Sequence, residues 1–160
     1  MKRLIYQVYV GKKSKLYDHC VASVKAYCKK YGIDHEVQKT PILMIKPDVF
    51  QTNRSKESYE KYGGYLPIYE KENAFAYLKS YDQVAIIDAD IWIRPDAPNI
   101  FEDLEEEYAF GGVVERTMPL NSAYKSKIQN YSRMQYGNLK SINWKWNDLG
   151  AEFFNMGMMV

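Results

Sequence analysis

The segment of residues 84–93, VAIIDADIWI, constrains the fold more than any other part of the chain. It begins with four apolar residues in succession, as in a strand that is buried on both faces. This run ends at Asp88 and Asp90, which are separated by the small Ala89. Residues two apart on an extended chain point to the same side, so we expect the two carboxylates to converge on one cation. Hard oxygen ligands that leave room for phosphate suit Mg²⁺ or Mn²⁺.

The residues before this segment predict a strand, a helix and a second strand. Residues 4–10 alternate in polarity and are rich in Ile, Val and Tyr, as strands are. A helix is expected from the N-cap Ser14 to Gly32, and a second strand over residues 34–39. Open α/β sheets bind ligands at the carboxyl ends of their parallel strands, where Asp88 would lie. We therefore predict an α/β fold with a mainly parallel sheet, helices on both faces, and a metal-dependent enzyme acting on a nucleotide-linked substrate.

The rest of the chain predicts shorter elements. Residues 42–45 fit either a strand or a buried turn. Pro67 suits the first turn of a helix that runs to Ser80. The residues expected on the core side of this helix are Ile68, Glu72, Phe75, Ala76 and Leu78. The remaining predicted elements are a short acidic helix over 99–107, a buried strand over 108–114, a helix over 121–137 and a strand over 153–160.

Composition limits the size and the surroundings of the protein. A chain of 160 residues with 46% hydrophobic content can bury one ordinary core, so we expect a single domain over residues 1–160. A balanced net charge of +2 gives no support for nucleic acid as a partner. No apolar run could span a bilayer or act as a signal peptide, so we expect no transmembrane segment and a cytoplasmic protein. Cys20 and Cys28, roughly 12 Å apart along one helix, are predicted to be buried free thiols.

The order of these segments resembles that of the GT-A glycosyltransferases, especially family 8 and its relatives. In those enzymes an apolar strand ends in Asp-x-Asp and a later strand begins with Phe-Asn-x-Gly; the matching residues here are 88–90 and 154–157. The resemblance implies a Rossmann-like GT-A fold and transfer of a sugar from a nucleotide diphosphate donor, by analogy a UDP-sugar, to a hydroxyl acceptor. It also implies that Asp88 and Asp90 hold Mn²⁺ or Mg²⁺ against the donor diphosphate, where the metal neutralises the charge of the leaving group.

The resemblance extends to several residues that would bind the donor. These residues are Tyr9, Val10 and Gly11 after the first strand, Lys71 on the helix before the metal strand, Ala89, and Asn155 and Gly157 in the last strand. Each of the more specific assignments has a structural alternative. Tyr9 could pack in the core, Lys71 could be a solvated surface charge, and Asn155 with Gly157 could form a turn at the start of a strand.

Part of the family pattern is missing. Family 8 enzymes take a metal-binding His from a carboxy-terminal His-x-x-Gly segment, which has no counterpart here, and neither His19 nor His35 matches it. The chain stops within an apolar run, so we expect it to lack the acceptor-binding part. The residues name no catalytic base or nucleophile, although Glu115 and Asp148 are the acidic residues to examine.

Two other functions fit parts of the sequence. The first is a nucleotide-sugar-binding domain that is catalytically incomplete. The second is a phosphatase of the haloacid dehalogenase type, in which Asp88 would be the nucleophile and Asp90 the acid/base. Trp92 stands where that motif has Thr or Val, which favours the transferase.

Overall fold

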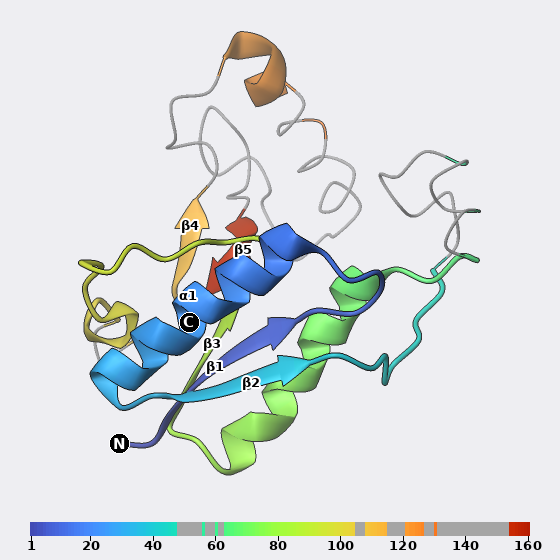
Figure 1. Ribbon diagram of the computed structural model, residues 1–160. Helices are drawn as coiled ribbons and strands as arrows, with labels where there is room; N and C mark the ends of the chain where they lie inside the picture. Colours follow the sequence, from blue (N-terminus) through green and yellow to red (C-terminus); the bar gives the residue numbers. More distant parts are fainter. Residues whose placement is uncertain are drawn as a thin grey trace. The chain divides into compact units, whose positions relative to one another are not determined.

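The computed structural model describes residues 1–47, 56, 60, 63–104, 108–114, 121–126, 130 and 154–160 (Figure 1). The chain divides into two compact units, the first formed by Met1–Phe110 with Val160 and the second by Gly111–Met159. A single domain over residues 1–160 stays a prediction. Within the described ranges, no helix has the length and the apolar character needed to cross a membrane.

Three parallel strands form the sheet of the first unit. β1 (Arg3–Val8) lies in the middle, with β2 (Asp34–Gln38) on one side and β3 (Gln83–Ile87) on the other. This arrangement confirms the predicted parallel strands. In the second unit β4 (Gly112–Val114) pairs with β5 (Phe154–Met159) in the antiparallel direction, so the strands of the chain are of mixed direction.

The helices α1 (Lys15–Tyr31) and η2 (Pro67–Lys79) cover opposite faces of the parallel sheet. Figure 1 shows α1 in front of the strands and η2 behind them. The alternation of β1 agrees, because the Tyr6 ring packs against Tyr77 of η2 while its neighbour Gln7 points to the other face. Helices on both faces, as predicted, are confirmed for this unit.

Helix α1 begins and ends where the sequence predicted. Gly32 follows the last turn with a left-handed φ of 65°, which favours glycine. Ser14 stands at the N-cap position, but its side chain makes no capping hydrogen bond. Cys20 and Cys28 are buried free thiols, as predicted. Burial is the main reason that the pKa of Cys28 is raised to about 12, and the negative charge of Asp34 adds to it.

The face of the 3₁₀ helix η2 that lies against the sheet is not the face that the sequence predicted. The five residues expected on the core side are all exposed, namely Ile68, Glu72, Phe75, Ala76 and Leu78. The buried residues are Glu70, Lys71 and Ala74. The prediction was wrong because it placed apolar side chains inside, whereas both charged side chains on the inner face have partners there.

Glu70 is the centre of a buried polar network. Its carboxylate accepts hydrogen bonds from the backbone N–H groups of Ile42 (2.8 Å), Leu43 (3.1 Å) and Met44 (2.9 Å). Side chains donate three more, from Gln38 (2.6 Å), Asn73 (2.9 Å) and Tyr65 (3.1 Å). Burial by itself would raise the pKa of Glu70, but these donors outweigh it and lower the pKa to about 2.

Several shorter elements differ from the sequence expectation. Residues 42–44 form neither a strand nor a buried turn, since their side chains are exposed. The helix expected over 99–107 is η3 (Ile100–Glu102), which the Asn99 side chain caps through the N–H of Phe101. Residues 108–110 lie outside β4 and are exposed. Residues 122–126 are helical, as expected for that part of the 121–137 segment.

Candidate functional site

A turn after β3 carries the two aspartates. The strand ends at Ile87, and the N–H of Ile91 donates to the carbonyl oxygen of Asp88 at 3.1 Å. Asp88 is half-buried, Asp90 is exposed, and Ala89 between them is buried. The carboxylates therefore do not lie on an extended chain, and strand alternation was the wrong geometry from which to argue their convergence. Both are open to solvent at the carboxyl end of a buried strand.

Lys71 of η2 lies against the first of these carboxylates. Its ammonium pairs with Oδ1 of Asp88, and the Lys71 side chain is only 9% exposed against 37% for Asp88. A solvated surface charge is therefore the wrong description of Lys71. Because a buried ammonium needs an anionic partner, this ion pair ties the inner face of η2 to the turn after β3.

Gln7 fixes the backbone of the same turn from the centre of the sheet. Its side-chain amide donates to the carbonyl oxygen of Asp88 at 3.2 Å, and its Oε1 faces Nε2 of His35 at 2.9 Å. This orientation of Gln7 assigns the proton to Nε2 of His35. Burial, and after it the charge of Lys25, lowers the pKa of His35, which favours the neutral ring. His35 serves Gln7 and is not placed to bind a metal at Asp88.

One side of α1 holds the segment that follows the turn. The Cys20 thiol lies 3.4 Å from the carbonyl oxygen of Asp90, and Ser23 Oγ accepts from the N–H of Ile93 at 3.0 Å. One helical turn on, the Tyr27 hydroxyl donates to the Pro98 carbonyl oxygen and accepts from the N–H of Ile100, both at 2.7 Å. The sequence predicted Cys20 as a buried free thiol but gave no sign of its contact with this segment or of the two hydrogen bonds of Tyr27.

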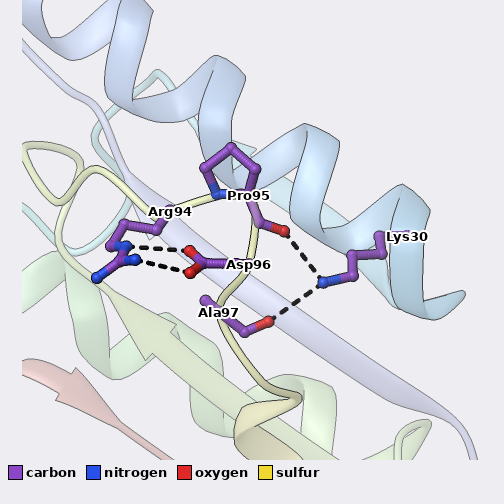
Figure 2. A network of polar contacts seen from close by, with 5 residues as sticks. All are labelled: Lys30, Arg94, Pro95, Asp96 and Ala97. Atoms are coloured by element: carbon purple, nitrogen blue, oxygen red, sulfur yellow. Dashed lines mark hydrogen bonds and ion pairs between the residues drawn. The ribbon is translucent and has the colours of Figure 1, made fainter.

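The last turn of α1 adds a second set of contacts. Figure 2 shows Lys30 reaching the carbonyl oxygens of Pro95 at 3.0 Å and Ala97 at 3.4 Å. Beside it, Arg94 and Asp96 form an exposed two-pronged ion pair. Side chains of α1 thus bind several backbone carbonyl oxygens and N–H groups of this segment, which fixes the path of the chain leaving the aspartates.

The loop between β1 and α1 is closed by Tyr9. Its hydroxyl donates to the Ser14 carbonyl oxygen at 3.0 Å and accepts from the Ser14 N–H at 2.7 Å, and its ring packs on Tyr17. Gly11 has a φ of 110° and open space around it, so a side chain there would be strained by backbone conformation and not by crowding. Val10 is half-buried. Stacking of Tyr9 on a base stays a prediction.

The other residues assigned from the family resemblance belong to the second unit. Asn155 Oδ1 accepts from the N–H of Gly157 at 2.8 Å, and both residues lie within β5, where Gly157 is buried. Their approach to Asp88 stays a prediction. Glu115 and Asp148 lie outside the described residues.

The carboxylate oxygens at the turn are ligands that suit a divalent cation. The described residues contain no group of three His, Cys, Asp or Glu side chains that could hold a metal by themselves. Mg²⁺ and similar ions keep several waters and are commonly bound by one or two carboxylates together with substrate phosphates. Asp88 and Asp90 fit that pattern, with Lys71 already on one oxygen of Asp88.

Comparisons with known proteins add one structural likeness. No family model matches the chain, and no curated protein matches it. A solved glycosyltransferase involved in the glycosylation of the major capsid of PBCV-1 is similar to it with a TM-score of 0.48 and 12% sequence identity, over 76% of this chain. The chain spans 54% of the length of that glycosyltransferase. A likeness of this degree is too slight to establish a shared fold or a shared function.

Proposed function

We propose that the chain forms the donor-binding part of a glycosyltransferase, which moves a sugar from a nucleotide diphosphate donor, a UDP-sugar by analogy, to a hydroxyl acceptor. The turn after β3 would bind the diphosphate. The placement of Asp88 and Asp90 carries this proposal, because they lie directly after a buried parallel strand, where α/β sheets bind their ligands.

Charge at the turn agrees with a diphosphate ligand. Asp88 and Asp90 would hold Mn²⁺ or Mg²⁺, which when bound neutralises the charge of the leaving nucleoside diphosphate. Lys71 brings a further positive charge to the same place. The backbone of the turn is held by Gln7 from the sheet and by Cys20 from α1, so the chain fixes the position of both carboxylate-bearing residues before any ligand binds.

Substitution of each aspartate tests the proposal. Asp88→Asn and Asp90→Asn should each weaken Mn²⁺-dependent binding of UDP by at least about tenfold, since loss of one charged ligand removes well over 1.4 kcal/mol. Isothermal titration calorimetry measures the binding, and circular dichroism verifies the fold. Asp96→Asn is the matched control, because Asp96 is exposed a few residues further on and pairs with Arg94. Unchanged, metal-dependent UDP binding in both Asp88→Asn and Asp90→Asn would place the site elsewhere.

A phosphatase assay on the same protein distinguishes the proposed glycosyltransferase from the phosphatase alternative. A phosphatase of the haloacid dehalogenase type would hydrolyse a generic aryl phosphate and form a phosphoaspartate at Asp88. We expect neither, because Trp92 stands where the phosphatase motif has Thr or Val. Hydrolysis that disappears in Asp88→Asn would favour the phosphatase.

A further inference from the structure

The ion pair between Lys71 and Asp88 has a consequence for how the turn binds a metal. Lys71 is buried, and its ammonium holds Oδ1 of Asp88, one of the two carboxylates that would bind a divalent cation. A metal ion at Asp88 therefore meets a positive charge that is already there. Because the Lys71 side chain is only 9% exposed, loss of its carboxylate partner to a metal would leave a poorly solvated ammonium without its counter-charge.

The combined charge of Asp88, Asp90 and Lys71 is too small to balance a divalent cation that binds alone. The side chains of Asp88, Asp90 and Lys71, counted by themselves among the described residues, sum to a single net negative charge. Adding a divalent cation would make this group net positive, at a place where one member is buried and water screens it weakly. A diphosphate bound with the metal restores the balance, and it offers oxygen acceptors for the Lys71 ammonium.

We infer that Lys71 acts as an internal counter-cation which couples metal binding to diphosphate binding. This inference rests on the proposed function. A divalent cation alone binds the chain weakly, because it must share Asp88 with Lys71. The cation and a nucleoside diphosphate bind together tightly, because the phosphates supply the negative charge that Lys71 has offset. By linkage, the cation strengthens binding of the diphosphate by the same factor as the diphosphate strengthens binding of the cation.

Neutralising Lys71 gives the sharpest test. Lys71→Gln should bind Mn²⁺ alone at least about tenfold more tightly than the wild type, because even 1.4 kcal/mol of relieved repulsion is a factor of ten. Mn²⁺ affinity is measured by electron paramagnetic resonance of the free ion, without nucleotide. Lys71→Arg keeps the charge and should bind Mn²⁺ as weakly as the wild type. Lys79→Gln is the matched control, because Lys79 is exposed near the end of the same helix.

A second substitution localises the effect. In Lys71→Gln with Asp88→Asn, the gain in Mn²⁺ affinity should disappear, because the carboxylate that Lys71 shares is gone.

A measurement on the unsubstituted chain needs no variant to fold. The ammonium signal of Lys71 in a ¹⁵N-lysine-labelled sample should move when Mg²⁺ and UDP are added together, and should stay in place with the same concentration of Mg²⁺ alone.

The outcomes distinguish this inference from the proposed function. Mn²⁺-dependent UDP binding in the wild type, combined with a Mn²⁺ affinity of Lys71→Gln that is no higher than that of the wild type, would overturn the coupling and leave the proposed function standing. Movement of the Lys71 signal with Mg²⁺ alone would also overturn the coupling. Absence of metal-dependent UDP binding in every variant would overturn the proposed function and the coupling with it.

Discussion

The two faces of the parallel sheet are stabilised by different chemistry. On the α1 face, buried Val24 and Cys28 pack as a hydropathy pattern predicts, and hydroxyl and thiol groups of α1 reach the backbone after the aspartates. On the η2 face, a buried carboxylate and a buried ammonium take the place of apolar side chains. The comparison teaches that a helix can be oriented by charged groups with fixed partners while large apolar side chains, here Ile68, Phe75 and Leu78, face solvent.

The largest expected effect is at the centre of the η2 face. Glu70→Ala leaves three backbone N–H groups and three side-chain donors without their acceptor, so it should lower the free energy of unfolding by about 3 kcal/mol or more. Glu72→Ala, two residues on and exposed, should change it by less than about 0.5 kcal/mol. Urea denaturation measures both. Equal effects of the two substitutions would show that the polar network does not hold η2.

The same carboxylate predicts how stability depends on pH. Its pKa is lowered from 4.5 to about 2 in the folded chain, so Glu70 stabilises the fold above the unfolded value. That contribution is lost as the pH falls from about 4.5 towards 2. Urea denaturation across this window should show a decline in the wild type that is smaller in Glu70→Gln, which has no carboxylate to titrate. Identical pH profiles would contradict the assignment.

On the α1 face the expected effects are smaller. Tyr27→Phe removes one hydroxyl that serves both the Pro98 carbonyl oxygen and the Ile100 N–H, and should cost about 1–2 kcal/mol of unfolding free energy. Tyr31→Phe removes only one hydrogen bond, to the Ala97 carbonyl oxygen, and should lower the free energy of unfolding by less. Thermal denaturation ranks the two. A larger loss for Tyr31→Phe would mean that the contacts of Tyr27 are not the main anchor of this segment.

The smallest effect is expected on the outer face of η2. Phe75 is 63% exposed, so Phe75→Ser should change the free energy of unfolding by no more than about 0.5 kcal/mol. Burial of a phenylalanine would instead make truncation cost about 3–5 kcal/mol. A loss of that size in urea denaturation would restore the orientation that hydropathy predicted.

Sequence patterns predicted the parallel strands and α1 because these elements follow local rules. Residues 84–87 are apolar in succession, as a doubly buried strand requires, and Gly32 can take the left-handed conformation that ends a helix. The position of Asp88 after that strand was equally local information. The turn at Asp88–Ile91 was not predicted, because the hydrogen bond that closes it leaves no clear mark in the residues.

The partners of the charged residues could not be found from sequence. Glu70 and Lys71 are adjacent, and such a pair on a helix is ordinarily solvated. Their burial depends on groups distant in sequence, the N–H groups of residues 42–44 for Glu70 and the carboxylate of Asp88 for Lys71. Gln7 is a similar case, since only the tertiary structure brings its amide to the Asp88 carbonyl oxygen. The family resemblance named Lys71 for another reason, its place before the metal strand.

Mapping of the UDP and Mg²⁺ site by NMR tests the central claim most directly. In a ¹⁵N-labelled sample, the joint addition of UDP and Mg²⁺ should shift the backbone amide signals of residues 88–91 and of the loop at residues 9–14, with the Lys71 ammonium signal among them. The outer face of η2, marked by Phe75 and Leu78, should not respond. Shifts that leave residues 88–91 unchanged, or the absence of any shift, would contradict the assignment of this turn as the diphosphate site.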